Sequence, residues 1–502
     1  MSMAWRRPSL PALAFLTWLL IAAVGFGGRF LNGDGDTARH LRHGETILAR
    51  GDVIRNDPFS FTRPGEPYVS FEYGAQVLLA LAHRIAGLGG VVALGATLAA
   101  LAVALTLRFM LRRGVEPAAA YVAAAIGAVL LATHWIARPH LFTFVLLAVL
   151  LERLDRPKAP APFAILALFV VWANLHGGWV FGMALLGAWA LGRLVDAWRT
   201  GGPEEWSLAR ATLWSVPAAA IATLLTPYGT AAPLHLAAHL NDSALLRTAH
   251  EFRPPTFTDA GSLVFLLLTI GATIGFARAW PRTGLPTPHL IAILGFTVGG
   301  FLARRNIPLV ALTALPLAML HLDPLLLRLP EPPNLRRSFA EATGGSWVPG
   351  ALAACVVWLA AVAGHRGGPR LLPTAFDANT FPVEAVAALR AEPGTLRLFN
   401  EYTWGGYVLW ADPGQRVFID PGADFYGSAL ALDYLRVWEQ EPGWRDVLAR
   451  FDVDAALVPA GSPLVEALVG EDGWRIRHAD RTAVLLVREP GAPAAGRGTP
   501  PP

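Results

Sequence analysis

The chain has 502 residues, of which 54% are hydrophobic and 16% charged, with a formal net charge of +4. Such a low charge content, against roughly 25% in an average soluble domain, excludes an ordinary soluble enzyme and predicts a polytopic membrane protein. The single cysteine excludes an intramolecular disulfide and a cysteine metal cluster, and the small basic excess does not by itself indicate a nucleic-acid partner.

Several apolar runs approach or exceed the ~18 residues of a membrane-span candidate, and eleven spans are predicted in all, some of them short. They lie at 10–28, 90–111, 118–134, 139–152, 162–174, 178–196, 209–226, 261–280, 287–304, 306–322 and 348–365. The first run has the regions of a signal peptide, but the many later runs favour an uncleaved span. The segment 75–87 has amphipathic spacing, which predicts a separate helix at the membrane interface before the second span.

The basic residues of the short loops indicate how these spans are oriented. With the N-terminus inside, alternation places one large set of basic residues on the same side: Arg6, Arg7, Arg112, Arg113, Arg153, Arg156, Lys158, Arg193, Arg199, Arg278, Arg282, Arg328, Arg336 and Arg337. Short cytoplasmic loops carry such an excess of Lys and Arg. The pattern therefore predicts a cytoplasmic N-terminus and an extracytoplasmic chain after residue 366.

The long first outer loop, 29–74, contains the segment GDGDTARHLRHGE, which crowds titratable side chains beside an apolar run. A helix is predicted to begin at Asp36, an excellent N-cap, and to end at Gly51. The same Asp36 carboxylate, held beside a membrane-facing pocket, has the chemistry to take a proton from an acceptor hydroxyl. His40 follows one turn later, close enough to interact with Asp36, and His43 belongs to the same charged cluster.

Other carboxylates of this loop have less specific interpretations. Asp34 and Asp36 form a DxD pattern, which is a weak signal alone and leaves a divalent cation on the pair open. Glu72, in SFEYG, is either a second carboxylate of the site or a helix cap. Asp57, in NDPFSF, most simply fixes a turn.

Arg304 and Arg305, in ARRN, break the positive-inside pattern at a turn with hardly any loop to solvate them. Charged groups at such positions usually face a cavity or a partner, although snorkelling to the lipid headgroups is the alternative. Because Arg138 and Arg253 are predicted on the same side, we expect these arginines to form an anion-binding pocket. The planar guanidinium pairs well with two phosphate oxygens. We also expect His140 and His176, which lie at outer span ends, to contribute to this pocket.

Residues 367–490 read as a soluble α/β unit that follows a membrane domain, 1–366. LRLFN, VFID, DAALVPA and TAVLLVRE are predicted strands, and SALALDYLRVWEQE and PGWRDVLARF are predicted helices. A polar and aromatic set in this unit is either an acceptor-binding surface or a set of structural residues: Asn400, Trp404, Gly405, Gly406, Tyr407, Asp420 and Tyr426. The Gly/Pro/Ala-rich tail 491–502 is predicted to be disordered.

Several motifs together resemble a bacterial family of polytopic membrane glycosyltransferase-like proteins with the GT-C architecture. They are the loop GDGDTARHLRHGETILARGDVIRNDPFSFTRPGEPYVSFEYGAQVLL, then ARPHLFTF, NLHGGWVFG, TPYG and ARRNIPL, and in the tail NEYTWGGYVLW and VFIDPGADFYG. The resemblance implies a mainly α-helical GT-C-like bundle with a C-terminal extracytoplasmic α/β domain. It also implies transfer of a sugar from a polyprenyl-phosphate donor. In this family an acidic residue of the first outer loop acts as the base or positions the acceptor, and the resemblance gives that role to Asp36, with Asp34 as the next candidate. Arg304 and Arg305 fit the donor phosphate by position.

The sequence therefore predicts a multi-pass glycosyltransferase of the bacterial cytoplasmic (inner) membrane, acting in the cell envelope on the extracytoplasmic side. Asp36 and Asp34 are the expected catalytic residues. The expected substrate-binding residues are His40, His43, Glu72, Arg138, His140, His176, Arg304 and Arg305. The expected partners are a polyprenyl-phosphate-linked sugar and membrane lipid, with a divalent cation as the one cofactor left open. A transporter or flippase for a lipid-linked or anionic solute is the first alternative, and a non-catalytic envelope-assembly protein is the second.

Overall fold

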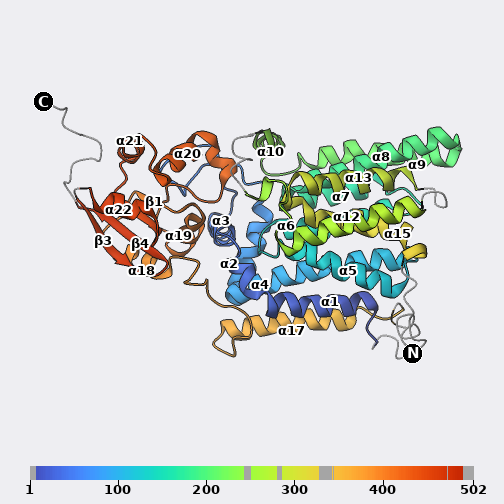
Figure 1. Ribbon diagram of the computed structural model, residues 1–502, viewed down its shortest axis with the longest axis horizontal. Coiled ribbons are helices and arrows are strands. Elements are labelled where there is room, and N and C mark those ends of the chain that lie inside the picture. Colours follow the sequence, from blue (N-terminus) through green and yellow to red (C-terminus); the bar gives the residue numbers. More distant parts are fainter. Residues whose placement is uncertain are drawn as a thin grey trace.

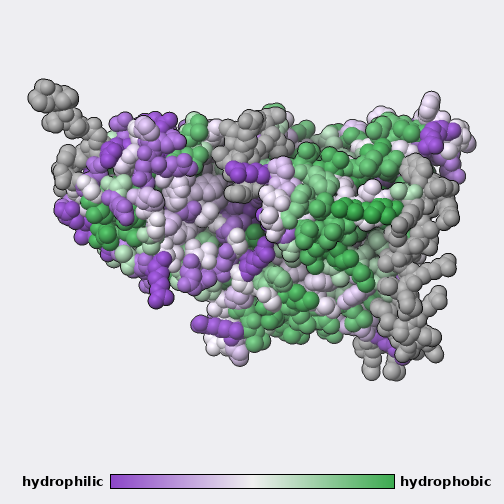
Figure 2. All heavy atoms as spheres, in the orientation of Figure 1, coloured by the Kyte–Doolittle hydropathy of each residue, from purple (hydrophilic) through white to green (hydrophobic). Residues whose placement is uncertain are grey.

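In the computed structural model, the chain forms a helical bundle with a smaller α/β domain at one end (Figure 1). The structure describes residues 7–241, 250–279, 285–326, 342, 344–471 and 473–489. The predicted disordered tail and the loop residues Arg6, Arg282, Arg328, Arg336 and Arg337 lie outside these ranges. On the face shown in Figure 2, apolar residues cover much of the bundle, and hydrophilic residues are more frequent over the α/β domain.

Helices account for the whole bundle in the part of the chain that the structure describes. The α-helices are α1 (Leu10–Leu20), α2 (Gly27–Asn32), α3 (Asp36–Arg50), α4 (Tyr73–Arg112), α5 (Pro117–Ala132), α6 (His140–Leu154), α7 (Pro162–Leu175), α8 (Trp179–Thr200), α9 (Pro203–Ala222), α10 (Ala231–Asn241), α12 (Ala260–Ala279), α13 (Thr287–Leu302), α14 (Ile307–Leu312), α15 (Ala314–Leu326) and α17 (Val348–His365). A π-helical turn η2 (Ile21–Gly25) extends α1, and the 3-10 turns η3 (His250–Phe252) and η4 (Arg304–Asn306) lie in loops.

A helix occupies each of the eleven predicted span ranges, but the number of membrane spans is not settled by this. Among the residues that the structure describes, four helices are long and apolar enough to cross a membrane: Tyr73–Arg112, Trp179–Thr200, Ala260–Ala277 and Val348–His365. The bent pair formed by Arg304–Leu312 and Ala314–Leu322 would make a fifth. Eleven spans therefore remain a prediction.

One local expectation in the first outer loop needs correction. The N-cap of α3 is Gly35, and Asp36 is the first helical residue, so its carboxylate does not cap the helix. The predicted C-terminal signal is confirmed, because Gly51 adopts a left-handed conformation (φ 69°). The predicted boundary of the segment 75–87 is confirmed, because non-helical backbone angles at Ala86 and Gly87 (φ 60° at Gly87) divide the 40-residue α4 into two helical parts. The position of its first part at the membrane interface remains a prediction.

The α/β domain is built on a four-stranded sheet in the order β1-β2-β4-β3. The strands are β1 (Leu398–Asn400), β2 (Ala455–Pro459), β3 (Trp474–Ala479) and β4 (Ala483–Arg488). β1 and β2 are parallel, whereas β4 is antiparallel to both β2 and β3, with Leu457 opposite Leu485. The surrounding helices are α18 (Val383–Ala391), α19 (Gly405–Ala411), α20 (Ala423–Trp438), α21 (Trp444–Arg450) and α22 (Pro463–Val469), with the 3-10 turn η5 (Tyr402–Trp404).

Three of the four predicted strands are confirmed, and both predicted helices correspond to α20 and α21. VFID forms no strand; Val417 makes isolated parallel bridges to Leu398 and to Ser60 of the first outer loop. The Val417 N–H donates to the Phe59 carbonyl at 3.1 Å, and the Phe61 N–H donates to the Val417 carbonyl at 3.2 Å. The first outer loop thus continues the edge of the sheet and joins the two parts of the molecule.

Candidate active site

The centre of the candidate site is a pair of aspartates held by one arginine. Arg138, in the loop between α5 and α6, contacts Asp34 Oδ2 through Nη1 and Asp36 Oδ2 through Nη2, both at 2.8 Å. Asp34 lies in the turn before α3, where its Oδ1 accepts the Asp36 backbone N–H at 3.0 Å. That bond fixes the turn that leads into α3. Asp36 is only 7% exposed, so its carboxylate is buried beside Arg138.

A second carboxylate extends this cluster to the predicted arginine pair. Glu251, in η3, lies 3.8 Å from Arg138 Nη1 through Oε2 and 3.1 Å from Arg305 Nη1 through Oε1. The Arg305 guanidinium also stacks 4.3 Å from the centre of the Phe252 ring. The aspartates of the first outer loop and Arg305 of the α13–α14 turn therefore belong to one connected cluster at the same end of the bundle.

Arg304 does not enter this cluster with its side chain as expected. The Arg304 guanidinium pairs with Asp259 at 3.2 Å and is 45% exposed. Its backbone N–H donates to the Arg253 carbonyl at 2.9 Å, which fixes the turn that presents Arg305. Of the two adjacent arginines, Arg305 is the one directed at the site.

Glu72 forms the other side of the candidate site with two histidines. Although it occupies the N-cap position of α4, its side chain makes no capping hydrogen bond. Its Oε1 lies 3.4 Å from His176 Nε2, and its Oε2 lies 3.8 Å from His40 Nδ1. His176 Nδ1 contacts the Thr143 hydroxyl at 2.8 Å. Of the two interpretations of Glu72, this geometry supports a carboxylate of the site.

Burial sets the protonation states of these groups. Burial raises the pKa of Asp36 to about 7 against the opposing effect of Arg138, and it raises the pKa of Glu72 to about 7 against Arg39 and Arg138. Burial, Arg305 and Arg138 lower the pKa of His176 to about 3, so this imidazole is neutral at pH 7. A carboxyl group that titrates near neutral pH is suited to general base catalysis.

The remaining predicted histidines have supporting positions. His43 stacks on Phe59 with 4.2 Å between ring centres and contacts the Tyr68 hydroxyl at 3.3 Å, away from the aspartate pair. His140 Nε2 contacts the His134 carbonyl at 2.7 Å, which closes the loop that carries Arg138. His40 contacts Gln76 and Glu72 rather than meeting Asp36 as expected.

Two important residues were missed by sequence reasoning. Glu251 lies in a segment that had been placed at an outer end, but no local pattern pairs it with arginines elsewhere in the chain. Arg39, one turn after Asp36, donates to the Tyr68 hydroxyl at 2.7 Å and pairs with Asp420 of the α/β domain at 3.0 Å. The three-residue spacing from Asp36 was the signal that could have identified Arg39.

The α/β domain packs directly on α3. A Cβ atom at Gly35 would collide with the Thr403 carbonyl, and one at Gly406 would collide with the Gly35 carbonyl. The seven residues proposed as an acceptor surface are all buried, and they bond within the protein; Asn400, for example, donates to the Ile419 carbonyl at 2.8 Å. This burial supports the structural alternative for that set.

A metal site is not indicated by the geometry. Within the described ranges, no group of three or more His, Cys, Asp or Glu residues is placed to hold a metal ion. Arg138 already contacts both Asp34 and Asp36, the two carboxylates that were left open as ligands. A divalent cation on this pair remains a prediction.

Comparison with known proteins places this geometry in a known fold. No family model matches the chain, and no curated protein matches it by sequence. The structure is similar to the oligosaccharyltransferase AglB from Archaeoglobus fulgidus, solved with an inhibitory peptide and a dolichol-phosphate, with a TM-score of 0.54 and 14% identity over 90% of this chain and 69% of AglB. It is also similar to ArnT from Cupriavidus metallidurans bound to undecaprenyl phosphate, with a TM-score of 0.50 and 16% identity over 96% of this chain and 98% of ArnT.

The predicted GT-C architecture is confirmed. Both solved structures hold a polyprenyl phosphate, which is dolichol-phosphate in the AglB oligosaccharyltransferase and undecaprenyl phosphate in ArnT. At these identities the likeness establishes the fold of the chain, a mainly helical membrane bundle with a small C-terminal sheet, and the roles of individual residues must be argued from the site itself.

Proposed function

We propose that the protein is a glycosyltransferase that moves a sugar from a polyprenyl-phosphate donor to an acceptor hydroxyl at the end of the bundle that carries the α/β domain. The observation that carries the proposal is the single cluster of Asp36, Arg138, Glu251 and Arg305, which joins a buried carboxylate to two guanidinium groups. Transfer from a lipid phosphate needs a base for the incoming hydroxyl and positive charge for the departing phosphate.

In the proposed reaction, Asp36 accepts the proton of the acceptor hydroxyl while the acceptor oxygen forms a bond to the anomeric carbon. The bond between that carbon and the phosphate oxygen breaks, and its electron pair leaves with the polyprenyl phosphate. Arg305 and Arg138 stabilise the negative charge that develops on the phosphate. Glu72, with neutral His40 and His176, borders the sugar and positions it.

Glu251 suggests where the phosphate binds. Its carboxylate bridges Arg138 and Arg305, so a phosphate group at this place would find the same two guanidinium groups and would displace Glu251. Arg305 pairs with it at 3.1 Å, while Arg138 is 3.8 Å away, which leaves Arg138 free to hold the aspartate pair as well.

An apolar groove beside Arg305 supports a lipid-linked donor. The groove has a volume of about 310 Å³, runs between α8 and α13 past Ala184, Gly187 and Gly295, and ends at Asn306. Asn306 follows Arg305 directly in the chain, so a lipid tail in the groove would bring its phosphate to the arginine. The charged groups of the site lie in loops and helix ends rather than at mid-depth, which favours transfer over transport.

The test uses the purified full chain with polyprenyl-phosphate hexoses and pentoses, and it measures release of free polyprenyl phosphate. Asp36→Asn should reduce turnover by about 10²–10⁴-fold while donor binding is retained, because only the base is lost. The matched control is Asp52→Asn, an exposed aspartate just after α3. Undiminished turnover by the Asp36 variant would refute its role, and failure to bind any donor would favour the non-catalytic alternative.

A further inference from the structure

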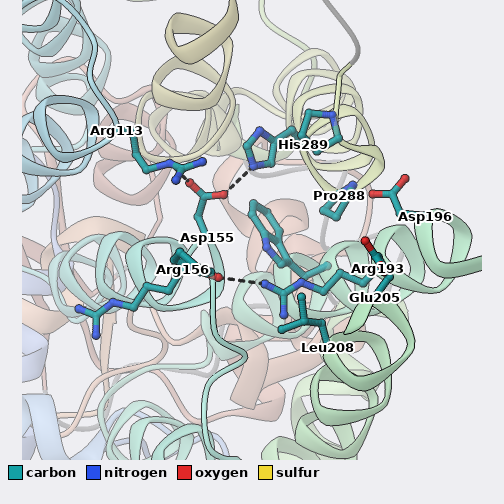
Figure 3. A pocket seen from close by; sticks show the side chains of 12 residues that line it. Arg113, Asp155, Arg156, Arg193, Asp196, Glu205, Leu208, Pro288 and His289 are labelled. Atoms are coloured by element: carbon teal, nitrogen blue, oxygen red, sulfur yellow. Dashed lines mark hydrogen bonds and ion pairs between the residues drawn. The ribbon is translucent and has the colours of Figure 1, made fainter. Parts of the chain in front are cut away.

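A second cavity lies at the far end of the bundle from the α/β domain, at the predicted cytoplasmic end. It has a volume of about 370 Å³ and is enclosed by the loops after α4 and α6, by α8 and α9, and by the start of α13 (Figure 3). Its walls include Arg113, Asp155, Trp189, Arg193, Asp196 and Leu208. None of these residues belongs to the candidate active site.

Three carboxylates line this cavity, those of Asp155, Asp196 and Glu205 (Figure 3). The first two are paired within the protein. Asp155 contacts Arg113 at 2.8 Å through one oxygen and His289 at 2.7 Å through the other (Figure 3). Asp196 accepts hydrogen bonds from both the backbone N–H and the hydroxyl of Thr287. These two carboxylates are therefore not arranged to bind a cation.

Arg193, by contrast, has only neutral hydrogen-bond partners among the described residues. Its guanidinium donates to the Thr212 hydroxyl at 2.8 Å, to the Leu154 carbonyl at 2.9 Å and to the Arg156 carbonyl at 3.3 Å (Figure 3). These bonds hold the group in place without neutralising its charge. A fixed cation in the wall of a cavity favours an anionic ligand.

The positive charge extends beyond the cavity wall. Arg156, which also lines the cavity, shares the Glu152 carboxylate with Arg108 and Arg112, at 3.5, 2.9 and 2.8 Å respectively. With Arg113 and Arg193, these make five guanidinium groups against four carboxylates, those of Glu152, Asp155, Asp196 and Glu205. The loop between α6 and α7 adds Lys158. A multiply charged or membrane-bound anion would be attracted to this end of the bundle.

Exposed aromatic side chains indicate the depth at which the cavity opens. Trp198, near the end of α8, is 78% exposed, and Phe163, at the start of α7, is 79% exposed. Trp206, in the first turns of α9, is also exposed. Exposed aromatic rings of this kind gather at the headgroup level of a membrane. The cavity thus opens where lipid phosphates lie, and Trp189 and Leu208 give it an apolar wall.

We propose that this cavity binds the headgroup of an anionic phospholipid from the leaflet at this end of the bundle. The lipid phosphate pairs with Arg193, and the glycerol portion packs against Trp189 and Leu208. The proposal does not depend on the glycosyltransferase reaction, because it concerns a separate site at the opposite end of the protein.

The experiment is native mass spectrometry of the full chain in detergent with phosphatidylglycerol, phosphatidylcholine of the same acyl chains, or inorganic phosphate. We expect phosphatidylglycerol to be retained at least fivefold more than phosphatidylcholine, and Arg193→Gln to reduce its retention about tenfold. Glutamine keeps a donor toward the Leu154 carbonyl but removes the charge. The matched control is Arg199→Gln, on the same helix outside the cavity, which should bind as the unmodified chain does.

A second variant guards against a general loss of structure. Leu208→Trp fills the cavity without removing charge, and it should reduce phosphatidylglycerol retention while the unfolding temperature of the lipid-free protein stays the same. Equal retention by Arg193→Gln and the unmodified chain, or equal retention of both phospholipids, would overturn the proposal. Competition by millimolar inorganic phosphate as strong as that by the lipid would show a free-anion site instead. No sugar donor is present, so these results are independent of the proposed transfer reaction.

Discussion

The two ends of the bundle contain the same types of side chain but use them differently. Near the α/β domain, Asp36 and Glu72 are buried with incomplete pairing, and burial raises the pKa of each to about 7. At the far end, Asp155 is paired on both oxygens, by Arg113 and His289. The difference indicates that one end is suited to proton transfer and the other to stable structure and static binding. A buried carboxylate that keeps an unpaired oxygen can exchange a proton, whereas one with both oxygens paired cannot do so readily.

The largest expected difference between the two ends comes from removing one carboxylate from each. Asp36→Asn should reduce turnover by about 10²–10⁴-fold and leave the unfolding temperature nearly unchanged. Asp155→Asn should do the reverse: it leaves Arg113 and His289 without their counter-charge and costs about 3 kcal/mol of stability. The measurements are release of polyprenyl phosphate per folded molecule and thermal unfolding in the same detergent. Similar profiles for the two variants would contradict the distinction between the ends.

A second prediction concerns how the α/β domain supports the reactive end. Asp420 accepts from the Gly422 N–H at 2.7 Å and pairs with Arg39, which lies one turn from Asp36. Asp420→Asn should loosen α3 and lower kcat by about 10–10²-fold with little change in KM for the donor, because misplacing a base slows the chemical step. The matched control is Asp433→Asn, whose partners Arg436 and Arg450 are far more exposed. A change in KM alone would contradict a positioning role for Asp420.

The sequence predicted the positions of the helices well because hydropathy and capping residues are local signals. The Gly51 signal, the helix from Asp36 and the tight turn at Arg304 and Arg305 all follow from such patterns. β3 was missed because most of its side chains are exposed and its sequence, WRIRHA, lacks a clear apolar alternation. VFID, although apolar, is not a strand: its backbone bridges to β1 and to the first outer loop are isolated ones at Val417, and the side chains of Asn400 and Thr62 bond the backbone that follows.

The candidate site was predicted as a collection of residues but not as a set of contacts. Outer-end position identified Asp34, Asp36, Glu72, Arg138 and Arg305. Local patterns could not show that Arg138 holds the aspartates, since the two lie 102 and 104 residues away from it in the chain. The bridging role of Glu251 and the Arg39–Asp420 pair depend on tertiary packing, for which a single sequence carries no periodic signal.

The pH dependence provides a third prediction, with opposite signs for rate and stability. Asp36 must be ionised to accept a proton, so turnover should fall about tenfold per pH unit well below its pKa of about 7. The Asp36 and Glu72 carboxyls bind more protons in the folded than in the unfolded state between the ordinary carboxyl pKa and 7, so their contribution to stability should decrease as pH rises through this range. The lowered pKa of His176 contributes in the opposite direction, so the carboxyl contribution is read as the difference between the unmodified chain and Asp36→Asn. Measuring kcat and unfolding temperature from pH 5 to 8 tests both.

The control for the pH profile is Glu72→Gln. If Asp36 is the titrating base, this variant keeps the midpoint of the rate profile within about one unit while it loses part of the stability change. A rate profile whose midpoint disappears in Glu72→Gln would instead assign the base to Glu72.

The smallest expected effect comes from Glu251. If this carboxylate occupies the place of the donor phosphate between Arg138 and Arg305, Glu251→Gln removes a competing negative charge and should tighten binding of polyprenyl phosphate severalfold. The size is small because Glu251 is about one-third exposed and the pairs it forms are partly screened by solvent. Equilibrium binding of polyprenyl phosphate to the two proteins measures the effect, and Asp259→Asn, which removes the partner of Arg304, is the matched control. Weaker binding by Glu251→Gln would mean that this side chain positions the arginines for the phosphate, and the phosphate would then lie elsewhere along Arg305.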